Sequence, residues 1–96
     1  MKKNIYEMAQ LFDVLSNEVR LCILLNLFNN QEKNVGGLQN CAKVSQSVVS
    51  QQLAKLKLNQ IICCKKVGNE VFYSICDEDI KIILKTLLEN SLEITK

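Results

Sequence analysis

The sequence predicts a mostly α-helical domain with one small β-hairpin, and three observations support this fold class. Apolar residues recur every three or four positions in several stretches, which is the spacing of amphipathic helices. Near the C-terminal end, apolar and polar residues alternate beside Gly68-Asn69, a pair typical of tight hairpin turns. The 96 residues suffice for one modest core, so we expect a single domain spanning residues 1–96.

The N-terminal part is expected to contain three helices. The apolar positions of the first are Ile5, Met8, Ala9, Phe12 and Leu15. Ser16-Asn17 offers an N-cap for the second, whose apolar positions are Val19, Ile23, Leu24, Leu27 and Phe28. Residues 29–34 are polar and are expected to form a loop. Residues 35–42 then form a short third helix, weakened by Gly36-Gly37.

The C-terminal part is expected to contain two helices that flank the hairpin. Ser45 can cap a fourth helix running to about residue 58, with Val48, Val49, Leu53 and Leu56 on its buried side. Residues 61–67 and 70–75 are the expected strands. Asp77 can cap the last helix, whose apolar stripe is Ile80, Ile83, Leu84, Leu87 and Leu88. This order of elements is the sequence outline of a winged helix-turn-helix.

Positive charge is concentrated in one central segment. Residues 43–69 contain five lysines and no acid, although the whole chain has a net charge of only +2. A solvated surface usually carries mixed signs, whereas a segment that meets a polyanion is expected to be basic throughout. The charge pattern therefore favours nucleic acid as a partner of this segment.

The fourth helix presents Gln46, Ser47, Ser50 and Gln51 on the side opposite its apolar residues. Glutamine both donates and accepts hydrogen bonds, which matches the N6/N7 edge of adenine, and serine fits several base edges or a phosphate. These residues occupy the first two turns, which enter the major groove in this architecture. The sequence therefore predicts a helix that reads duplex DNA. The expected DNA-binding residues are Lys43, Ser45, Gln46, Ser47, Ser50, Gln51, Lys55, Lys57, Lys65 and Lys66.

The first and last helices carry apolar stripes that we expect to form a homodimer. A dimer presents two recognition helices to half-sites about one helical turn apart, roughly 34 Å, on a palindromic operator. A monomer of this size would bind weakly. The expected dimerisation residues are Ile5, Met8, Phe12, Ile80, Ile83, Leu84, Leu87 and Leu88.

Other function classes lack the residues they need. The chain has no histidine, no C-x-x-C or C-x-C pair and no phosphate-binding glycine loop, so we expect neither an enzyme nor a metal or other cofactor. The five aromatic residues offer no platform for single-stranded RNA. No apolar run approaches the roughly 20 residues that span a bilayer, and the N-terminus lacks a signal-peptide core, so we expect a cytoplasmic protein without a membrane partner. A winged-helix module used only for protein interaction or dimerisation remains an alternative.

The chain resembles the ArsR/SmtB family of winged-helix repressors in four motifs. Residues 15–21, LSNEVRL, are similar to its L-S-x-x-x-R-L signature, with Glu18 at a position where proline is frequent. Residues 35–38, VGGL, are similar to its V-G-x-L, and residues 45–53, SQSVVSQQL, to its recognition helix S-Q-S-x-V-S-x-x-L. Gly68 and residues 71–73 resemble its G-x-x-V-x-Y wing. The resemblance implies a dimer that represses transcription until an inducer weakens its hold on an operator.

The resemblance does not extend to the sensing sites of the family. Residues 35–38 replace the C-x-C of one metal-sensing subgroup. The Asp and His pairs of another subgroup match Asp77, Asp79, Asn90 and Glu93, which lack imidazoles, and the two aspartates are better explained by capping and the helix dipole. A subgroup that senses reactive sulfur carries cysteines where this chain has Leu25 and Leu92. A constitutive regulator without an inducer site is therefore a second alternative.

The five cysteines are odd in number and are expected to be reduced thiols that fill small apolar spaces. Cys63 and Cys64 are neighbours in a strand, so their side chains point to opposite faces and a disulfide between them is disfavoured. One of them could face solvent beside Lys65 and Lys66, whose charges favour the thiolate and its oxidation. The candidate redox thiols are Cys22, Cys63 and Cys64.

Overall fold

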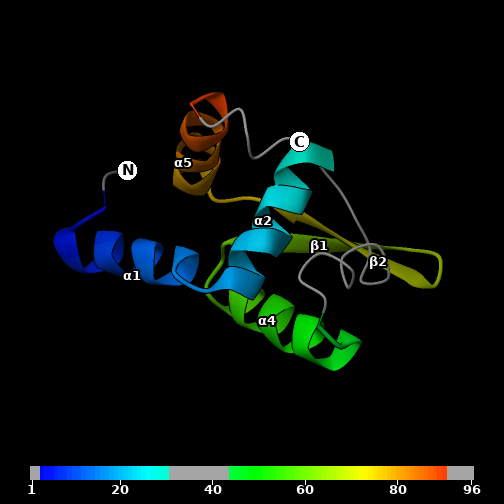
Figure 1. The fold of residues 1–96 in the computed structure, drawn as a ribbon. Helices are drawn as coiled ribbons and strands as arrows, with labels where there is room; N and C mark the ends of the chain where they lie inside the picture. Colours follow the sequence, from blue (N-terminus) through cyan, green and yellow to red (C-terminus); the bar gives the residue numbers. More distant parts are fainter. Residues whose placement is uncertain (1–2, 31–43, 91–96) are drawn as a thin grey trace.

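The computed structural model describes residues 3–30 and 44–90 (Figure 1). Its elements are α1 (Ile5–Leu15), α2 (Glu18–Asn30), α4 (Gln46–Leu58), β1 (Ile62–Val67), β2 (Glu70–Ile75) and α5 (Glu78–Glu89). The predicted mostly helical class with a hairpin before the last helix is confirmed. The expected third helix at residues 35–42 and Lys43 lie outside the described residues.

The described helices begin where the sequence provides a capping side chain. Asn17 Oδ1 accepts from the backbone N–H of Arg20 at 3.0 Å, and Asp77 Oδ1 accepts from that of Ile80 at 3.0 Å. Ser45 caps α4 as predicted. Asn4 and Glu7 form a reciprocal capping box at the start of α1, which the sequence reading missed. The expected loop start at residue 29 is wrong, because the polar end of α2 continues as helix through Asn30.

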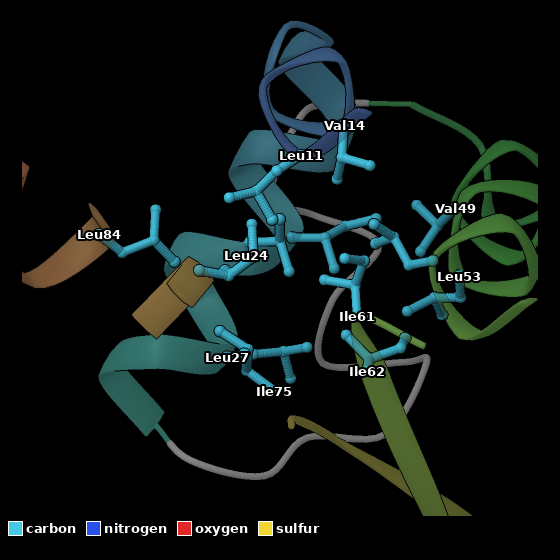
Figure 2. Close-up of a cluster of buried hydrophobic side chains, with 13 residues drawn as sticks. Leu11, Val14, Leu24, Leu27, Val49, Leu53, Ile61, Ile62, Ile75 and Leu84 are labelled. Atoms are coloured by element: carbon cyan, nitrogen blue, oxygen red, sulfur yellow. The ribbon is translucent and has the colours of Figure 1, made fainter. Parts of the chain in front are cut away.

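Helix α2 lies at the centre of the molecule, with α1, α4, α5 and the hairpin around it (Figure 1). Its residues Ile23, Leu24 and Leu27 are fully buried, as the sequence predicted. The surrounding elements each contribute apolar side chains to this one core (Figure 2). Those side chains are Leu11, Val14, Val49, Leu53, Leu56, Ile61, Ile62, Ile75, Ile80 and Leu84.

Helices α1 and α5 divide their apolar residues between this core and the surface. In α1, Leu11 and Val14 are buried, while Ile5 and Phe12 are 84% and 61% exposed. In α5, Ile80 and Leu84 are buried in the core of their own protomer, so the expectation that they contact a partner is corrected here. Exposed apolar residues of the two helices are Ile5, Tyr6, Met8, Phe12, Ile82 and Leu87, whereas Ile83 packs partly against the core and Leu88 is half-buried.

The hairpin is a two-stranded antiparallel sheet whose register pairs Ile62 with Ile75 and Val67 with Glu70. Gly68 in its turn has φ 62°, a left-handed conformation that glycine adopts without strain. Ile62 and Ile75 are buried and attach the base of the hairpin to the core, whereas Val67 to Glu70 at its tip are exposed. The hairpin therefore projects from the core as a wing.

Candidate nucleic-acid interface

Helix α4 has one buried face and one exposed face. Val49, Leu53 and Leu56 are buried against the core, which fixes the rotation of the helix about its axis. Gln46, Ser47, Ser50 and Gln51 are all exposed in its first two turns. Val48, expected on the buried side, is half-buried at the edge between the faces. The structure thus presents the four predicted base-reading residues together on the surface of a firmly held helix.

The N-terminal end of α4 carries no acidic residue in its first turn. Ser45 Oγ accepts from the backbone N–H of Val48 at 3.4 Å and lies 3.1 Å from Ser47 Oγ. The aligned peptide dipoles give such a helix end a partial positive charge, which favours a phosphate. Two hydroxyls therefore lie beside a helix end that suits an anion.

Arg20 of α2 holds α4 in place through a hydrogen bond that the sequence reading missed. The side chain is 7% exposed, and its Nε donates to the carbonyl of Val14 at 2.9 Å. Its Nη2 donates to the carbonyl of Asp13 at 3.2 Å, and its Nη1 donates to Gln52 Oε1 at 3.0 Å. One guanidinium thus links the end of α1, the start of α2 and the recognition helix. The signal in the sequence was a lone arginine within an apolar helix.

The predicted phosphate-contacting lysines of the described chain are exposed. Lys55 and Lys57 lie in the last turn of α4, and Lys65 and Lys66 lie in β1. Lys65 pairs in register with Phe72 and Lys66 with Val71, so the two lysines point to opposite faces of the wing. Glu70 adds a carboxylate at the tip of the wing. Positive charge therefore follows α4 and the wing, with one acid at the far end.

Lys3 ties the start of the chain to the start of α5. Its Nζ lies 2.7 Å from Asp79 Oδ2 and 3.5 Å from Asp77 Oδ2. The hydrogen bond to Asp79 is the main reason that the pKa of Lys3 is raised above 10.5. Asp77 therefore caps α5 as the sequence predicted, whereas the ion pairs of both aspartates with Lys3 were not predicted. Glu93 lies outside the described residues, and Asn90 Nδ2 donates to the carbonyl of Thr86 at 2.8 Å.

A polar cavity of about 420 Å³ lies between α1, the C-terminal end of α4 and residues 59–61, which connect α4 to β1. Its charged lining residues are Lys3, Glu7, Asp13, Arg20, Lys55 and Asp77. Three of them are basic and three acidic, so the lining has no net charge that would select an anion or a cation. Over residues 3–30 and 44–90, no cluster of three or more His, Cys, Asp or Glu side chains has an arrangement suited to a metal ion.

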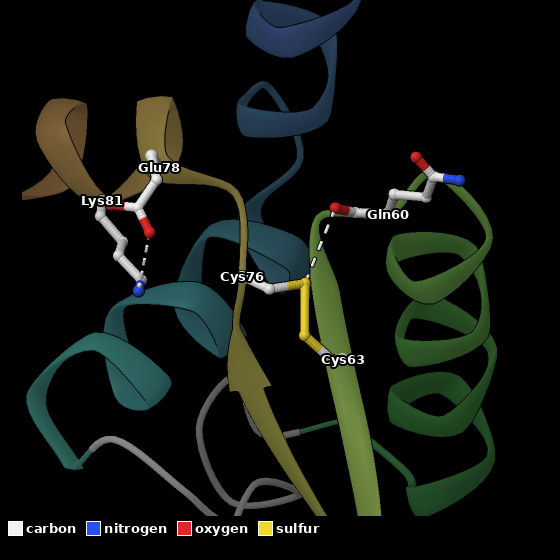
Figure 3. Close-up of a disulfide and its surroundings, with 5 residues drawn as sticks. All are labelled: Gln60, Cys63, Cys76, Glu78 and Lys81. Carbon is white, nitrogen blue, oxygen red and sulfur yellow. Dashed lines mark hydrogen bonds and ion pairs between the residues drawn. A yellow bond between two sulfur atoms is a disulfide. The ribbon is translucent and has the colours of Figure 1, made fainter.

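The cysteines depart from the expectation of reduced thiols. Cys63 and Cys76 form a disulfide at the base of the wing (Figure 3). Cys64 is a half-buried free thiol, which agrees with the prediction that neighbouring Cys63 and Cys64 point apart. Cys22 is half-buried in α2 and is also disulfide-bonded, so the expectation that it is a reduced thiol is wrong. The sequence reading missed Cys76 as the partner of Cys63.

The fold and this surface define a class of protein, a winged helix-turn-helix regulator of transcription. Residues 17–60 match the family model described as "Bacterial regulatory protein, arsR family". The chain is 34% identical over 87 residues to the transcriptional activator HlyU of Vibrio cholerae, covering 91% of this chain and 80% of HlyU. It is 30% identical over 79 residues to the transcriptional repressor PagR of Bacillus anthracis, covering 82% of this chain and 79% of PagR. The chain belongs to the ArsR/SmtB family of bacterial DNA-binding regulators.

The solved structure of HlyU from Vibrio cholerae superposes on this fold with a TM-score of 0.82 at 34% identity, covering 93% of this chain and 96% of HlyU. This likeness confirms the predicted winged-helix architecture. The predicted resemblance to the family is confirmed as well, and its members are regulators of transcription rather than enzymes. No helix in the described part of the chain is long and apolar enough to cross a membrane.

Proposed function

We propose that the protein is a homodimeric transcriptional repressor that reads a palindromic operator with α4 and acts in the cytoplasm, where bacterial DNA lies. The main support for this proposal is the exposed face of α4, which is formed by Gln46, Ser47, Ser50 and Gln51. The opposite face of the same helix is fully buried and fixes its orientation. A recognition helix needs this combination, because base contacts require short polar groups held at a constant orientation.

The exposed face of α4 suits a mixed set of base contacts. Gln46 and Gln51 can each donate to and accept from an adenine edge, while Ser47 and Ser50 reach other bases or the backbone. Ala54 is exposed one turn after Ser50 and offers a methyl group to a thymine. The lysines of α4 and the wing then supply the affinity that does not depend on sequence.

The proposed dimer surface is the exposed apolar part of α1 and α5. Both helices lie on the side of the molecule away from the tip of the wing (Figure 1). Ile82 is 61% exposed and replaces the buried Ile80 and Leu84 in the proposed surface. Large apolar side chains that are this exposed on two helices support an interaction site. A dimer formed here would leave both recognition helices free to bind DNA.

Selection of bound duplexes from a random DNA pool tests the proposal directly. We expect enrichment of a palindrome whose half-sites are about one helical turn apart. Transcription in vitro from a promoter that contains this sequence should then fall as protein is added. An increase in transcription would show that the protein is an activator rather than a repressor. Recovery of no preferred sequence would leave the protein-interaction module as the better interpretation.

The wing contribution is tested by replacing Lys65 and Lys66 together with glutamine. Each phosphate contact adds about 0.9 to the slope of log affinity against log salt concentration. Two lysines in each protomer should therefore make the slope shallower by as much as about 3.6, with the preferred sequence unchanged. Fluorescence anisotropy at several salt concentrations measures this slope. An unchanged slope would remove the wing from the interface.

The dimer is tested by Phe12→Glu. Phe12 is 61% exposed, so a charge is tolerated in the monomer but is buried at a dimer surface, where it costs several kcal/mol. We expect a monomer by analytical ultracentrifugation and a loss of operator affinity of about 100-fold or more, since one half-site binds alone. Asp13→Asn, a neighbouring exposed position, serves as the control. A Phe12→Glu dimer would exclude α1 from the interface.

A further inference from the structure

The disulfide at the base of the wing joins β1, a strand of the wing, to the segment between β2 and α5. Cys63 is the second residue of β1, and Cys76 lies between the end of β2 and the cap of α5. Their Cα atoms are 5.9 Å apart, within the usual range for a disulfide. The register pairs Cys63 with Ser74, so Cys76 is its diagonal neighbour on the same face of the hairpin.

Both cysteines are accessible, and the fold does not depend on the bond between them. Cys63 and Cys76 are exposed, whereas the adjacent pair Ile62 and Ile75 points to the other face and is buried in the core. That apolar pair and the strand ladder hold the hairpin whether the sulfurs are joined or separate. Small thiols and disulfides in solution can therefore reach the pair without unfolding the domain.

Cys76 also lies against the exit of the recognition helix, just before the start of α5. After α4 the chain turns through Gln60, which has φ 63°, and Cys76 Sγ lies 3.8 Å from the carbonyl oxygen of Gln60 (Figure 3). The backbone N–H groups of Cys76 and Asp77 both donate to the carbonyl of Ile61, at 3.0 and 3.2 Å. In the dithiol form the Cys76 S–H can donate to the Gln60 carbonyl. The Sγ atom of Cys76 therefore has a partner in both redox states, Cys63 in the disulfide and the Gln60 carbonyl in the dithiol.

We propose that Cys63 and Cys76 form a reversible thiol–disulfide site through which a low-molecular-weight disulfide modifies the protein and alters its grip on DNA. One cysteine thiolate attacks the small disulfide, forming a mixed disulfide and releasing one small thiol. The second cysteine thiolate then attacks the protein sulfur of this mixed disulfide. The Cys63–Cys76 bond forms, a second small thiol leaves, and two electrons have passed from the protein to the small disulfide.

The link to DNA binding rests on the proposed function. A protein that binds the bacterial chromosome works where disulfides are normally reduced, so a closed bond there reports an oxidising change. Closing it ties β1, the strand that follows α4, to the residue before the cap of α5, and α5 carries part of the proposed dimer surface. The distance between the two recognition helices of the dimer is then restricted before the protein binds DNA. Because less motion remains to be lost on binding, the closed form binds the operator more tightly.

The test uses the full chain equilibrated in mixtures of glutathione and glutathione disulfide. Alkylation followed by peptide mass spectrometry measures the Cys63–Cys76 bond, and anisotropy measures affinity for the operator selected from the random pool. The double variant Cys63→Ser/Cys76→Ser lacks the pair, and Cys64→Ser retains it as the matched control. All three proteins keep Cys22 and Cys41, so differences between them report the pair alone.

We expect the bond to form and open reversibly in the natural sequence and in Cys64→Ser. The operator affinity of both should be at least about fivefold higher when oxidised, a usual size for coupling between sites. The operator affinity of the double variant should respond less to glutathione disulfide than that of the natural sequence, because only Cys22, Cys41 and Cys64 remain in it. A lower operator affinity of the oxidised form would contradict the proposed tightening of DNA binding by the closed bond. Failure of the bond to form, or an equal response of the double variant, overturns the proposal.

Failure of the proposed function gives a different result. In that case no redox form of any variant binds a preferred DNA sequence. Mass spectrometry still shows whether Cys63 and Cys76 form a reversible disulfide. Recovery of a Cys63–Cys76 bond that glutathione opens would support the site without a DNA link. Its absence at every ratio of glutathione to glutathione disulfide would overturn it.

Discussion

Replacing Gln46 with alanine is expected to reduce the discrimination between operator and random DNA by roughly 30-fold or more. A bidentate contact between a side chain and a base contributes about 1–3 kcal/mol of discrimination, and a dimer loses it in both half-sites. Nonspecific affinity should change little, because Gln46 carries no charge and the lysines remain. Competition between operator and random duplexes at a fixed salt concentration measures the ratio.

Gln10→Ala provides the matched control, since it makes the same chemical change on an exposed position of α1. Both variants should unfold within about 0.5 kcal/mol of the natural sequence, as surface substitutions usually do. The selection from a random pool, repeated with Gln46→Ala, should lose its preference at one position of each half-site. An equal loss of affinity on every sequence would show that Gln46 does not contact a base.

The recognition helix could be predicted because several levels of the sequence agree there. Ser45 specifies the start, Val49, Leu53 and Leu56 specify the buried face, and the polar residues between them must then be exposed. The buried residues Ile23, Leu24 and Leu27 of α2 could be predicted in the same way, from the apolar positions of that helix. Where local capping, periodicity and composition indicate the same element, the tertiary structure has little freedom to differ.

Periodicity could not decide which apolar residues of α1 and α5 face the core. Both helices are apolar over a wide arc, and the sequence does not say which part of the arc points inward. Leu11 and Val14 of α1 and Ile80 and Leu84 of α5 turn toward α2, which leaves Phe12 and Ile82 outside. The choice depends on how each helix crosses α2, and that is a property of packing between elements.

Two long-range contacts were not predicted, although the sequence pattern was sufficient to predict one of them. The hydrogen bond between Arg20 and Gln52 joins residues 32 positions apart, and only the docking of α2 against α4 brings them together. The bond between Cys63 and Cys76 was within reach. A two-residue turn at Gly68-Asn69 pairs Cys63 with Ser74, and working out this register would have placed Cys76 on the diagonal of Cys63.

Leu53→Ala is expected to lower the free energy of unfolding by about 2–5 kcal/mol, because it opens a cavity between α4 and α2. Leu53 is 1% exposed and lies on the face of α4 opposite the base-reading residues. Small domains are stable by only about 5–15 kcal/mol in total, so the melting temperature should fall by at least about 10 °C. Urea unfolding at a fixed protein concentration measures the change, since a dimer is more stable when concentrated.

Leu58→Ala makes the same chemical change on the same helix at a side chain that is 82% exposed, and its stability should stay within about 0.5 kcal/mol of the natural sequence. Once its binding is corrected for the unfolded fraction, Leu53→Ala should keep the preferred DNA sequence of the natural protein. Gln46→Ala should instead keep the natural free energy of unfolding and lose the preference for that DNA sequence. One face of α4 would then stabilise the fold, and the opposite face would recognise the DNA sequence. An equal loss of stability in both leucine variants would contradict the buried face assigned to α4.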